Sequence, residues 1–474
     1  MRDLYGDDSP IAAFATTPGK SPLTVIRCSG KGAIEALSLV FSRAEKLKQA
    51  CGNTILHGWI VAADKKIDEV LVSVFRAPKS YTGEDSVDIS CHGGIVAGHA
   101  VMEALKTAGF RDALPGEFTF RAFMNGKLDL TRSESVMELV CAKTETGRQN
   151  AIGRLSGALE TEINEVKKML VEVLAGAEIF LDYSEDEIGA DEDEIAGILP
   201  AQDKARQVLL RLKQLAASWQ RQRIYQEGVL AVIAGRPNAG KSSLFNLLLK
   251  EERSIVTENP GTTRDWIEAW VSIEGIPVRL VDTAGLRESA DPAEKIGIER
   301  SRQLLEEAEL VLYLVNGSEG ITDEDKLFFC GAQHKPLLII WNKADIAPMP
   351  DACYTRLFAP SVPISISAKT GEGITLLCET IAHAARKQTF DTAAAEGLQS
   401  SSQTVSLGSV RQKNLIETAC AAVKEALALA DRQEPLDLIA PMLREAVNAL
   451  GEITGEVSTA DILEEMFSRF CVGK

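Results

Sequence analysis

One stretch near the middle of the chain, residues 235–242 with the sequence GRPNAGKS, restricts the possible folds more than any other. An apolar run (229–234) precedes it and a helix-like segment (243–250) follows it, so the pattern predicts a strand, a phosphate-binding loop and a helix. Backbone N–H groups at the start of a helix lack intrahelical partners and favour negative charge. Lys241 is expected to place its charge near the β- and γ-phosphates of a nucleotide, and Ser242 to bind Mg²⁺ through its hydroxyl. By itself the stretch indicates a nucleotide phosphate site and no narrower function.

Three further stretches follow in an order that favours a GTP-binding module over a chance Gly-rich turn. Residues 261–265 (GTTRD) contain Thr263, which is expected to complete the Mg²⁺ shell. Residues 282–285 (DTAG) and 342–345 (NKAD) each follow an apolar, strand-like run, and ligands bind at such strand ends in open α/β sheets. The carboxylate of Asp345 can accept hydrogen bonds from the N1–H and amino groups of guanine, which adenine does not offer in that arrangement. The predicted nucleotide is therefore GTP.

The predicted GTP contacts lie in the phosphate loop, in the stretch that follows it and at these strand ends. They are Asn238, Ala239, Gly240, Lys241, Ser242, Ser243, Thr263, Asp282, Thr283, Ala284, Gly285, Asn342, Lys343, Asp345, Ser367, Ala368 and Lys369. Asp282 is expected to reach Mg²⁺ through water and the Gly285 amide to sense the γ-phosphate, while residues 367–369 close over the base. Ser242 and Thr263 are the predicted Mg²⁺ ligands.

Composition and charge limit the partners and the compartment. The chain has 474 residues, which is enough for about two to four domains. Its net charge of −17 is unlike that of a dedicated nucleic-acid-binding protein, so any RNA contact is expected to be local or shared with another protein. The acidic start lacks the apolar core of a signal peptide, and no run is long enough to cross a bilayer, which predicts a cytoplasmic protein without membrane contact. Nine scattered cysteines without a C-x-x-C pair indicate reduced thiols rather than disulfides or a zinc site.

Changes in the hydrophobic pattern divide the chain into four segments. Residues 1–122 alternate strand-like and helical runs, which is typical of an α/β or α+β domain. Residues 123–225 and 387–474 carry apolar residues at three- and four-residue steps, which predicts helices, with a Ser/Gln/Thr-rich linker at 399–404. The α/β GTP-binding module occupies 226–386 and is expected to be inserted into a single helical domain. Because each helical block buries only one face by itself, we expect the two blocks to pack together.

Within the N-terminal domain the expected strands are 23–28, 70–75 and 87–90, and the expected helices are 32–42 and 95–108.

Six motifs taken together resemble those of one family. They are 80–85 (SYTGED), 92–94 (HGG), 115–119 (PGEFT), 121–130 (RAFMNGKLDL), 235–242 (GRPNAGKS) and 471–474 (CVGK). With these motifs the whole chain resembles the MnmE (TrmE) family of tRNA-modification GTPases. The GTP-binding motifs are shared with many GTPases, whereas the N- and C-terminal signatures in one chain are far more specific. The resemblance implies a multidomain protein: an α/β (α+β) N-terminal tetrahydrofolate-binding domain that also forms a homodimer, an all-α helical domain, and an inserted Ras-like P-loop G domain.

The resemblance also implies an activity. Together with an FAD-dependent MnmG-type partner, the family installs an aminomethyl-type group at C5 of the wobble uridine of certain tRNAs. The one-carbon unit comes from a tetrahydrofolate derivative, 5-formyl- or methylene-tetrahydrofolate. The family's folate contacts fall on Arg27, Glu84, Lys127 and Lys474. Cations suit the carboxylated tail of such a ligand, and a carboxylate suits its donor-rich pterin ring.

Hydrolysis requires a group other than the usual glutamine. In Ras-like enzymes a Gln after the D-x-x-G motif orients the attacking water, but Leu286 stands there in this chain. The resemblance assigns the role to Glu294. It also implies a K⁺ ion held by Asn238, Thr257, Asn259 and Thr262, the last three of which thereby line the GTP site. The ion would take the place of an arginine finger, with two G domains pairing across their nucleotide faces.

Cys471 has two interpretations at this stage. The resemblance makes it a candidate catalytic thiol near the folate, and the alternative is a buried, inert thiol. A prenylation signal is rejected because Gly473 and Lys474 fit such a signal poorly and no basic run precedes it.

Two other functions are considered for the whole chain. One is a regulatory GTPase in ribosome assembly without modification chemistry, which the motifs around Glu84 and Cys471 disfavour. The other is a folate enzyme with a purely structural G domain, which the intact Asp282, Asn342 and Asp345 disfavour.

Overall fold

The chain passes between two structural units four times. The computed structural model describes residues 9–182, 198–251, 267–282, 303–331, 336–349, 363–394 and 405–473. One unit comprises Met1–Met137, Arg154–Leu209 and Val410–Lys474, and the other comprises Glu138–Gly153 and Leu210–Ser409. Three of the four divisions fall inside helices, namely α5 (Leu130–Cys141), α6 (Glu145–Leu155) and α9 (Ile198–Glu227). The domain boundaries expected at 122, 225 and 386 stay predictions.

The N-terminal part of the first unit is a six-stranded sheet with the order β3-β4-β5-β2-β1-β6. Neighbouring strands are antiparallel except β1 and β6, which are parallel. The strands are β1 (Ile11–Phe14), β2 (Leu23–Ser29), β3 (Thr54–Ala62), β4 (Lys65–Phe75), β5 (Ser86–His92) and β6 (Arg111–Asp112). Helices α1 (Ala33–Ser38), α2 (Ala44–Gln49) and α3 (Ile95–Thr107) pack with one face of this sheet in a single apolar cluster.

Local pattern accounts for most of this sheet. In β4 every second residue from Asp68 to Val74 is buried, which is the period-two signature of a strand with one covered face. The helix expected over 32–42 is wrong beyond Ser38, because the chain turns there and Phe41 pairs with Ile60 in an isolated β-bridge. Strands β1 and β3 were not expected from the sequence.

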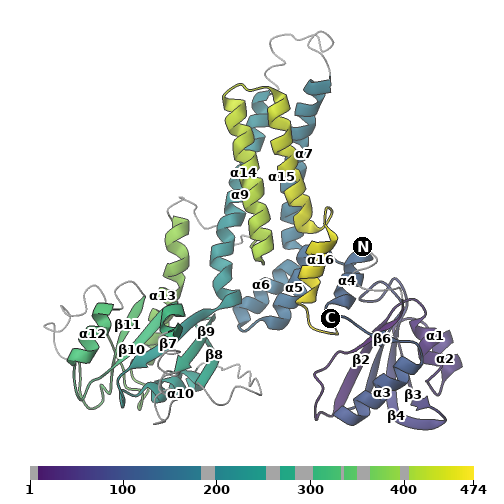
Figure 1. The fold of residues 1–474 in the computed structure, drawn as a ribbon, viewed down its shortest axis with the longest axis horizontal. Coiled ribbons are helices and arrows are strands. Elements are labelled where there is room, and N and C mark those ends of the chain that lie inside the picture. The colour runs from purple at the N-terminus through teal and green to yellow at the C-terminus, as the bar shows by residue number, and fades with distance from the viewer. Residues whose placement is uncertain are drawn as a thin grey trace. The chain divides into compact units, whose positions relative to one another are not determined.

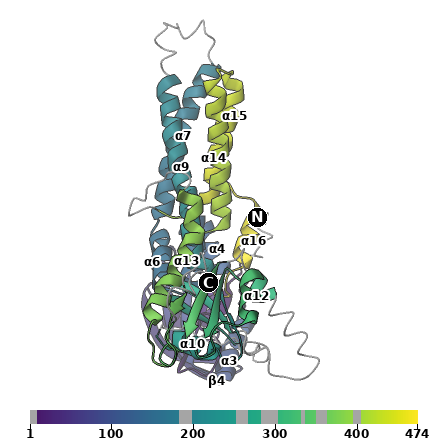
Figure 2. The same ribbon diagram turned by 90° about the vertical axis from the view of Figure 1, so that its left-hand side faces the viewer.

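Long helices from distant parts of the sequence lie side by side in the first unit (Figures 1 and 2). They are α7 (Ala158–Asp182), α14 (Val410–Asp431) and α15 (Leu436–Thr454), and α15 packs on both of the others. Ion pairs join the two blocks at Arg444–Glu178, with 2.8 Å between Nη2 and Oε1, and at Lys167–Glu456. The helical segments before and after the GTP-binding module therefore form one bundle.

The C-terminal helix is attached to a short helix next to the N-terminal sheet. Helix α16 (Ala460–Ser468) packs on α4 (Glu117–Met124) through an edge-to-face pair of Phe467 and Phe120, with 5.5 Å between ring centroids. Gly116, at the start of α4, has φ = 69°, and a Cβ placed there would lie 2.6 Å from the carbonyl oxygen of Phe467. Only glycine permits both this backbone conformation and this approach.

The second unit contains a six-stranded sheet with the order β12-β11-β10-β7-β9-β8. All neighbouring strands are parallel except β8 and β9. The strands are β7 (Val229–Gly235), β8 (Ile267–Ile273), β9 (Ile276–Asp282), β10 (Leu310–Asn316), β11 (Leu337–Asn342) and β12 (Ile364–Ser365), and the helices around them include α10 (Lys241–Glu251), α12 (Asp323–Gly331) and α13 (Ile374–Ala394).

The central strands of this sheet are apolar on both faces, as expected for parallel strands covered by helices. In β10, Leu310, Leu312 and Leu314 belong to the core shared with α10 and α13, and the residues between them face the core shared with α12. Strands β10 and β9 flank β7 on opposite sides. The loop after β7 therefore lies where the strand order reverses, which is the ordinary position of a ligand site in such sheets.

Replacing Gly116 by Ala should loosen the C-terminal helix. The positive φ costs about 1–2 kcal/mol for a residue with a Cβ, and the overlap with Phe467 adds about 1–3 kcal/mol. We expect faster proteolysis within α16 and a lower urea midpoint for the first unit. Gly109→Ala is the matched control, because Gly109 has φ = 102° but nothing within 4 Å of its Cβ position. Equal effects of the two substitutions would contradict the packing role.

Candidate functional site

The loop between β7 and α10 adopts a backbone conformation that accounts for its glycine and asparagine residues. Gly235, Asn238 and Gly240 have φ values of 140°, 61° and 95°. A Cβ at Gly235 would lie 2.5 Å from the carbonyl oxygen of Leu314, and one at Gly240 would lie 2.3 Å from Nδ2 of Asn342. Asn is among the few non-glycine residues that tolerate a left-handed conformation. The loop is thus held tightly against the ends of the neighbouring strands.

Two side chains at the start of α10 are arranged for phosphate and a cation. Lys241 is only 7% exposed, and its Nζ donates hydrogen bonds to the carbonyl oxygens of Gly235 (3.0 Å) and Arg236 (2.9 Å). The hydroxyl of Ser242 donates to Oδ2 of Asp282 at 2.8 Å. Asp282 is the buried last residue of β9. A hydroxyl beside a carboxylate is a donor set of hard oxygen atoms, which fits Mg²⁺.

The two motifs assigned to the base form one hydrogen-bonded network with the phosphate loop. The buried side chain of Asn342 donates through Nδ2 to the carbonyl oxygen of Ala239 (2.7 Å) and accepts through Oδ1 from the backbone N–H of Ala368 (3.0 Å). Ser367 donates through Oγ to Oδ1 of Asp345 at 2.7 Å. The carboxylate of Asp345 is thus oriented while the residue stays exposed. This arrangement can present a fixed hydrogen-bond acceptor to a guanine base.

The structure places a large part of the expected GTP site together. Asn238, Ala239, Gly240, Lys241, Ser242, Ser243, Asp282, Asn342, Lys343, Asp345, Ser367, Ala368 and Lys369 lie at the loop after β7, at the ends of β9 and β11, and in the turn after β12. The other expected residues, Thr257, Asn259, Thr262, Thr263, Thr283, Ala284, Gly285 and Glu294, lie outside the described residues, as does Lys474.

Three of the four residues expected to bind folate, namely Arg27, Glu84 and Lys127, lie in or beside the loop 78–84 in the first unit. Arg27 forms an ion pair with Asp88 (Nε to Oδ1, 3.1 Å), and its guanidinium lies 5.7 Å from the ring centroid of Tyr81. Lys127 donates through Nζ to the carbonyl oxygen of Pro78 at 3.0 Å. The pKa of Tyr81 is raised above its usual value, because the effect of burial exceeds the lowering effects of its hydrogen bond with Thr119 and of the charge of Arg27.

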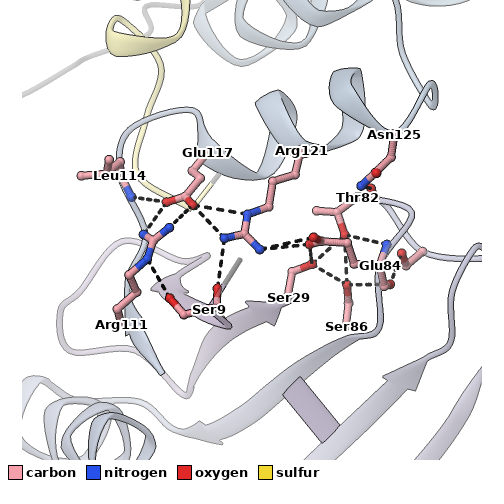
Figure 3. A network of polar contacts seen from close by, with 11 residues as sticks. Ser9, Ser29, Thr82, Glu84, Ser86, Arg111, Leu114, Glu117, Arg121 and Asn125 are labelled. Carbon is pink, nitrogen blue, oxygen red and sulfur yellow. Dashed lines mark hydrogen bonds and ion pairs between the residues drawn. The ribbon is translucent and has the colours of Figure 1, made fainter. Parts of the chain in front are cut away.

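Glu84 is held by a network that sequence reasoning did not assign to the site (Figure 3). Its Oε2 accepts from the hydroxyl of Ser29 (3.0 Å) and from Nη1 of Arg121 (3.2 Å). Arg121 also pairs with Glu117, which is fully buried and takes a second pair from Arg111. The available signal was the i, i+4 spacing of Glu117 and Arg121 within the PGEFT-x-R stretch, which puts both on one face of a helix.

The C-terminal tail lies against the N-terminal domain. The backbone N–H of Gly116 donates to the carbonyl oxygen of Cys471 at 3.4 Å. Gly473 has φ = 97°, and a Cβ there would lie 2.4 Å from the carbonyl oxygen of Phe14, at the end of β1 beside the strand that carries Arg27. Cys471 is exposed, so the interpretation as a buried thiol is wrong.

Two family models match the chain. The model of the GTP-binding protein TrmE N-terminus matches residues 10–127, and the model of the MnmE helical domain matches residues 130–471. The chain belongs to the MnmE (TrmE) family of tRNA-modification GTPases. The expected family, the multidomain fold class with a Ras-like G domain, and the GTPase class are confirmed by this membership.

Relatives in this family are similar over nearly their whole length. The tRNA modification GTPase MnmE of Treponema denticola is 43% identical over 480 residues, covering 99% of each chain. That of Borreliella burgdorferi is 39% identical over 480 residues and covers 100% of each. Among solved structures, the G domain of the T. maritima FeoB iron transporter is 26% identical, with a TM-score of 0.27, and covers 33% of this chain and 98% of that chain.

In the described ranges no helix combines the length and apolarity that a bilayer span needs.

Replacing Asn342 by Ala should weaken binding of GDP and GTP alike. The substitution removes the partners of the Ala239 carbonyl and the Ala368 N–H, and a buried backbone group without its partner costs about 1–3 kcal/mol. We expect roughly 10- to 100-fold lower affinity, measured by titration with a fluorescent guanine nucleotide. Asn246→Ala, at an exposed position of the same helix as Lys241, is the control. An unchanged affinity in the Asn342 variant would show that the network does not shape the site.

Proposed function

We propose that this chain is a potassium-activated GTPase that, with an FAD-dependent MnmG-type protein, uses a tetrahydrofolate one-carbon unit to install an aminomethyl-type group at C5 of the wobble uridine of tRNA. It acts in the cytoplasm, where tRNA and GTP are found, as a homodimer formed through its N-terminal domain. The observation that carries the proposal is the arrangement around the loop 78–84. The cations Arg27 and Lys127 contact this loop, and the loop carries the fixed carboxylate of Glu84, in the same unit that receives the C-terminal tail.

The N-terminal arrangement fits a folate chemically. Arg27 and Lys127 supply positive charge for a carboxylated tail, with Lys474 as a third cation. Both oxygen atoms of the Glu84 carboxylate lie within 3.4 Å of Nη1 of Arg121, and its side chain is about a quarter exposed, so its remaining lone pairs can accept from pterin N–H groups. Tetrahydrofolate, when bound, supplies the one-carbon unit. Cys471 is our candidate for a thiol that takes part in this chemistry.

In the G domain, the network around the phosphate loop supports the roles of the described residues, and the roles of Thr257, Asn259, Thr262, Thr263 and Glu294 rest on the sequence motifs and the resemblance. Lys241 and the loop amides bind the phosphates, and Asp345 accepts hydrogen bonds from guanine. Ser242 and Thr263 bind Mg²⁺, which Asp282 approaches through water. Asn238, Thr257, Asn259 and Thr262 hold K⁺. When bound, this ion supplies positive charge beside the bond between the β- and γ-phosphates. Glu294 orients the attacking water in place of the missing glutamine.

Replacing Glu84 by Gln tests the folate assignment. We expect at least tenfold weaker binding of 5-formyltetrahydrofolate by calorimetry, because the neutral amide is a poorer acceptor for pterin N–H groups. In a deletion strain expressing this variant, mass analysis should show loss of aminomethyl-type wobble uridines, while GTP hydrolysis by the purified protein persists. Glu69→Gln is the matched control, since Glu69 pairs with His57 on the same sheet. Unchanged wobble nucleosides in the deletion strain itself would favour a GTPase without modification chemistry.

Replacing Asn238 by Gly tests the potassium assignment. Glycine tolerates the observed φ of 61°, so the loop conformation is kept while the amide oxygen is lost. We expect wild-type turnover to be several-fold faster in K⁺ than in Na⁺ at equal ionic strength, and this ratio to fall to about one in the variant. Asn238→Asp, which keeps an oxygen ligand, should retain part of the preference. A K⁺ preference that survives in Asn238→Gly would remove Asn238 from the ion site.

A further inference from the structure

Arg236, the second residue of the phosphate loop, points its guanidinium into a set of acceptors beyond the loop. Its Nη1 donates to Oε2 of Glu319 at 2.9 Å and its Nη2 donates to the carbonyl oxygen of Gly320 at 3.2 Å. Its buried Nε lies 3.2 Å from Oδ2 of Asp325, which is an ion-pair distance without the geometry of a hydrogen bond. The side chain is only 15% exposed. In the sequence this residue occupies one of the variable positions of the G-x-x-x-x-G-K-S pattern and receives no role.

Asp325, in the first turn of α12, is the centre of this set. It is fully buried, its Oδ1 accepts from the hydroxyl of Tyr313 at 2.7 Å, and its Oδ2 accepts from the N–H and hydroxyl of Thr322 at 2.8 and 2.9 Å. Burial and the carboxylate of Asp325 raise the pKa of Tyr313, so the phenol stays a donor. A buried carboxylate requires such pairing, because its transfer from water is otherwise very unfavourable. Arg236 supplies the only positive charge among these contacts.

The same loop that accepts from Arg236 also touches the strand that carries Asn342. The backbone N–H of Gly317 donates to the carbonyl oxygen of Asn342 at 2.9 Å, and a Cβ at Gly317 would lie 2.6 Å from that oxygen. Within the loop, Asn316 donates through Nδ2 to Glu319 and accepts from the N–H of Ser318. The segment 316–322 therefore lies against both the phosphate loop and the end of β11.

We propose that Arg236 is a positioning residue for GTP binding, which ties the phosphate loop to Asp325 and to the segment 316–322 and so holds that loop in register with the base-binding Asn342. The guanidinium donates hydrogen bonds to Glu319 and Gly320 and lies at ion-pair distance from Asp325. These three groups lie in different directions, which the planar fork of a guanidinium can serve and the single ammonium of Lys does not reproduce. Because the fork is engaged with these acceptors, Arg236 does not act as an arginine finger in cis. The proposal concerns the GTPase site alone and stands independently of the folate chemistry.

The test compares Arg236→Gln, Arg236→Lys, Asp325→Asn and the double variant Arg236→Gln/Asp325→Asn in the full-length protein. Loosening the loop weakens ground state and transition state alike, so KM for GTP and Kd for GDP should rise about tenfold in Arg236→Gln, with kcat changed by less than about threefold. Arg236→Lys should recover only part of the affinity. In the double variant, KM for GTP and Kd for GDP should be no higher than in the more affected single variant, because the two side chains act through one contact.

Arg279→Gln is the matched control. Arg279 lies on β9 in the same domain and pairs with Glu268 in a similar two-point contact, with 2.6 and 2.7 Å between the atoms, but it does not contact the phosphate loop. The Arg279→Gln substitution should leave KM for GTP unchanged. A lower melting temperature of Arg236→Gln with an unchanged KM would show a merely structural role and overturn the proposal. Full recovery in Arg236→Lys, or additive effects in the double variant, would overturn it as well.

Discussion

Buried carboxylates paired with arginines hold the parts of this protein on which its function depends. Glu117 and Asp325 are fully buried, and Glu134 is nearly so. Each faces an arginine, because an unpaired buried charge would be strongly destabilising. Through these pairs Arg121 connects α4 to Glu84, and Arg236 connects the phosphate loop to α12. These ion pairs fix the positions of charged side chains that packing alone would leave free to move.

The third pair is located where the chain returns from the second unit. Arg411 lies in the first turn of α14, and its Nε and Nη2 donate to the carboxylate of Glu134 at 3.0 and 3.1 Å. Its Nη1 donates to the carbonyl oxygen of Glu452 near the end of α15. One side chain thereby joins α5, α14 and α15, so the two helical segments that flank the GTP-binding module meet at a fixed point.

Helix α4 has a comparable role beside the N-terminal sheet. Gly116, the residue before the helix, contacts the C-terminal tail. Arg121 within the helix and Asn125 just after it hold the loop 80–85, and Nδ2 of Asn125 donates to the carbonyl oxygen of Thr82. The tail and the loop are separated by almost 400 residues of chain, yet one short helix positions both. This explains physically why the motifs 80–85, 115–119 and 471–474 occur together in one chain.

Sequence by itself determined the GTP motifs, their order at strand ends, the α/β character of the G domain and the mixture of strands and helices in the N-terminal domain, because these depend on local patterns such as the apolar run before Gly235. The same patterns predicted the helical blocks. Only the tertiary structure decided that Arg236 and Arg121 turn toward buried carboxylates and that Asn342 bonds to both Ala239 and Ala368. Strand β3 and the early end of α1 were also missed. Strand β3 depends on its pairing with β4, and beyond α1 the chain brings Phe41 to a bridge with Ile60. A sequence pattern shows which residues can be buried or charged, whereas the partner of a buried charge is decided by the packing of segments distant in the chain.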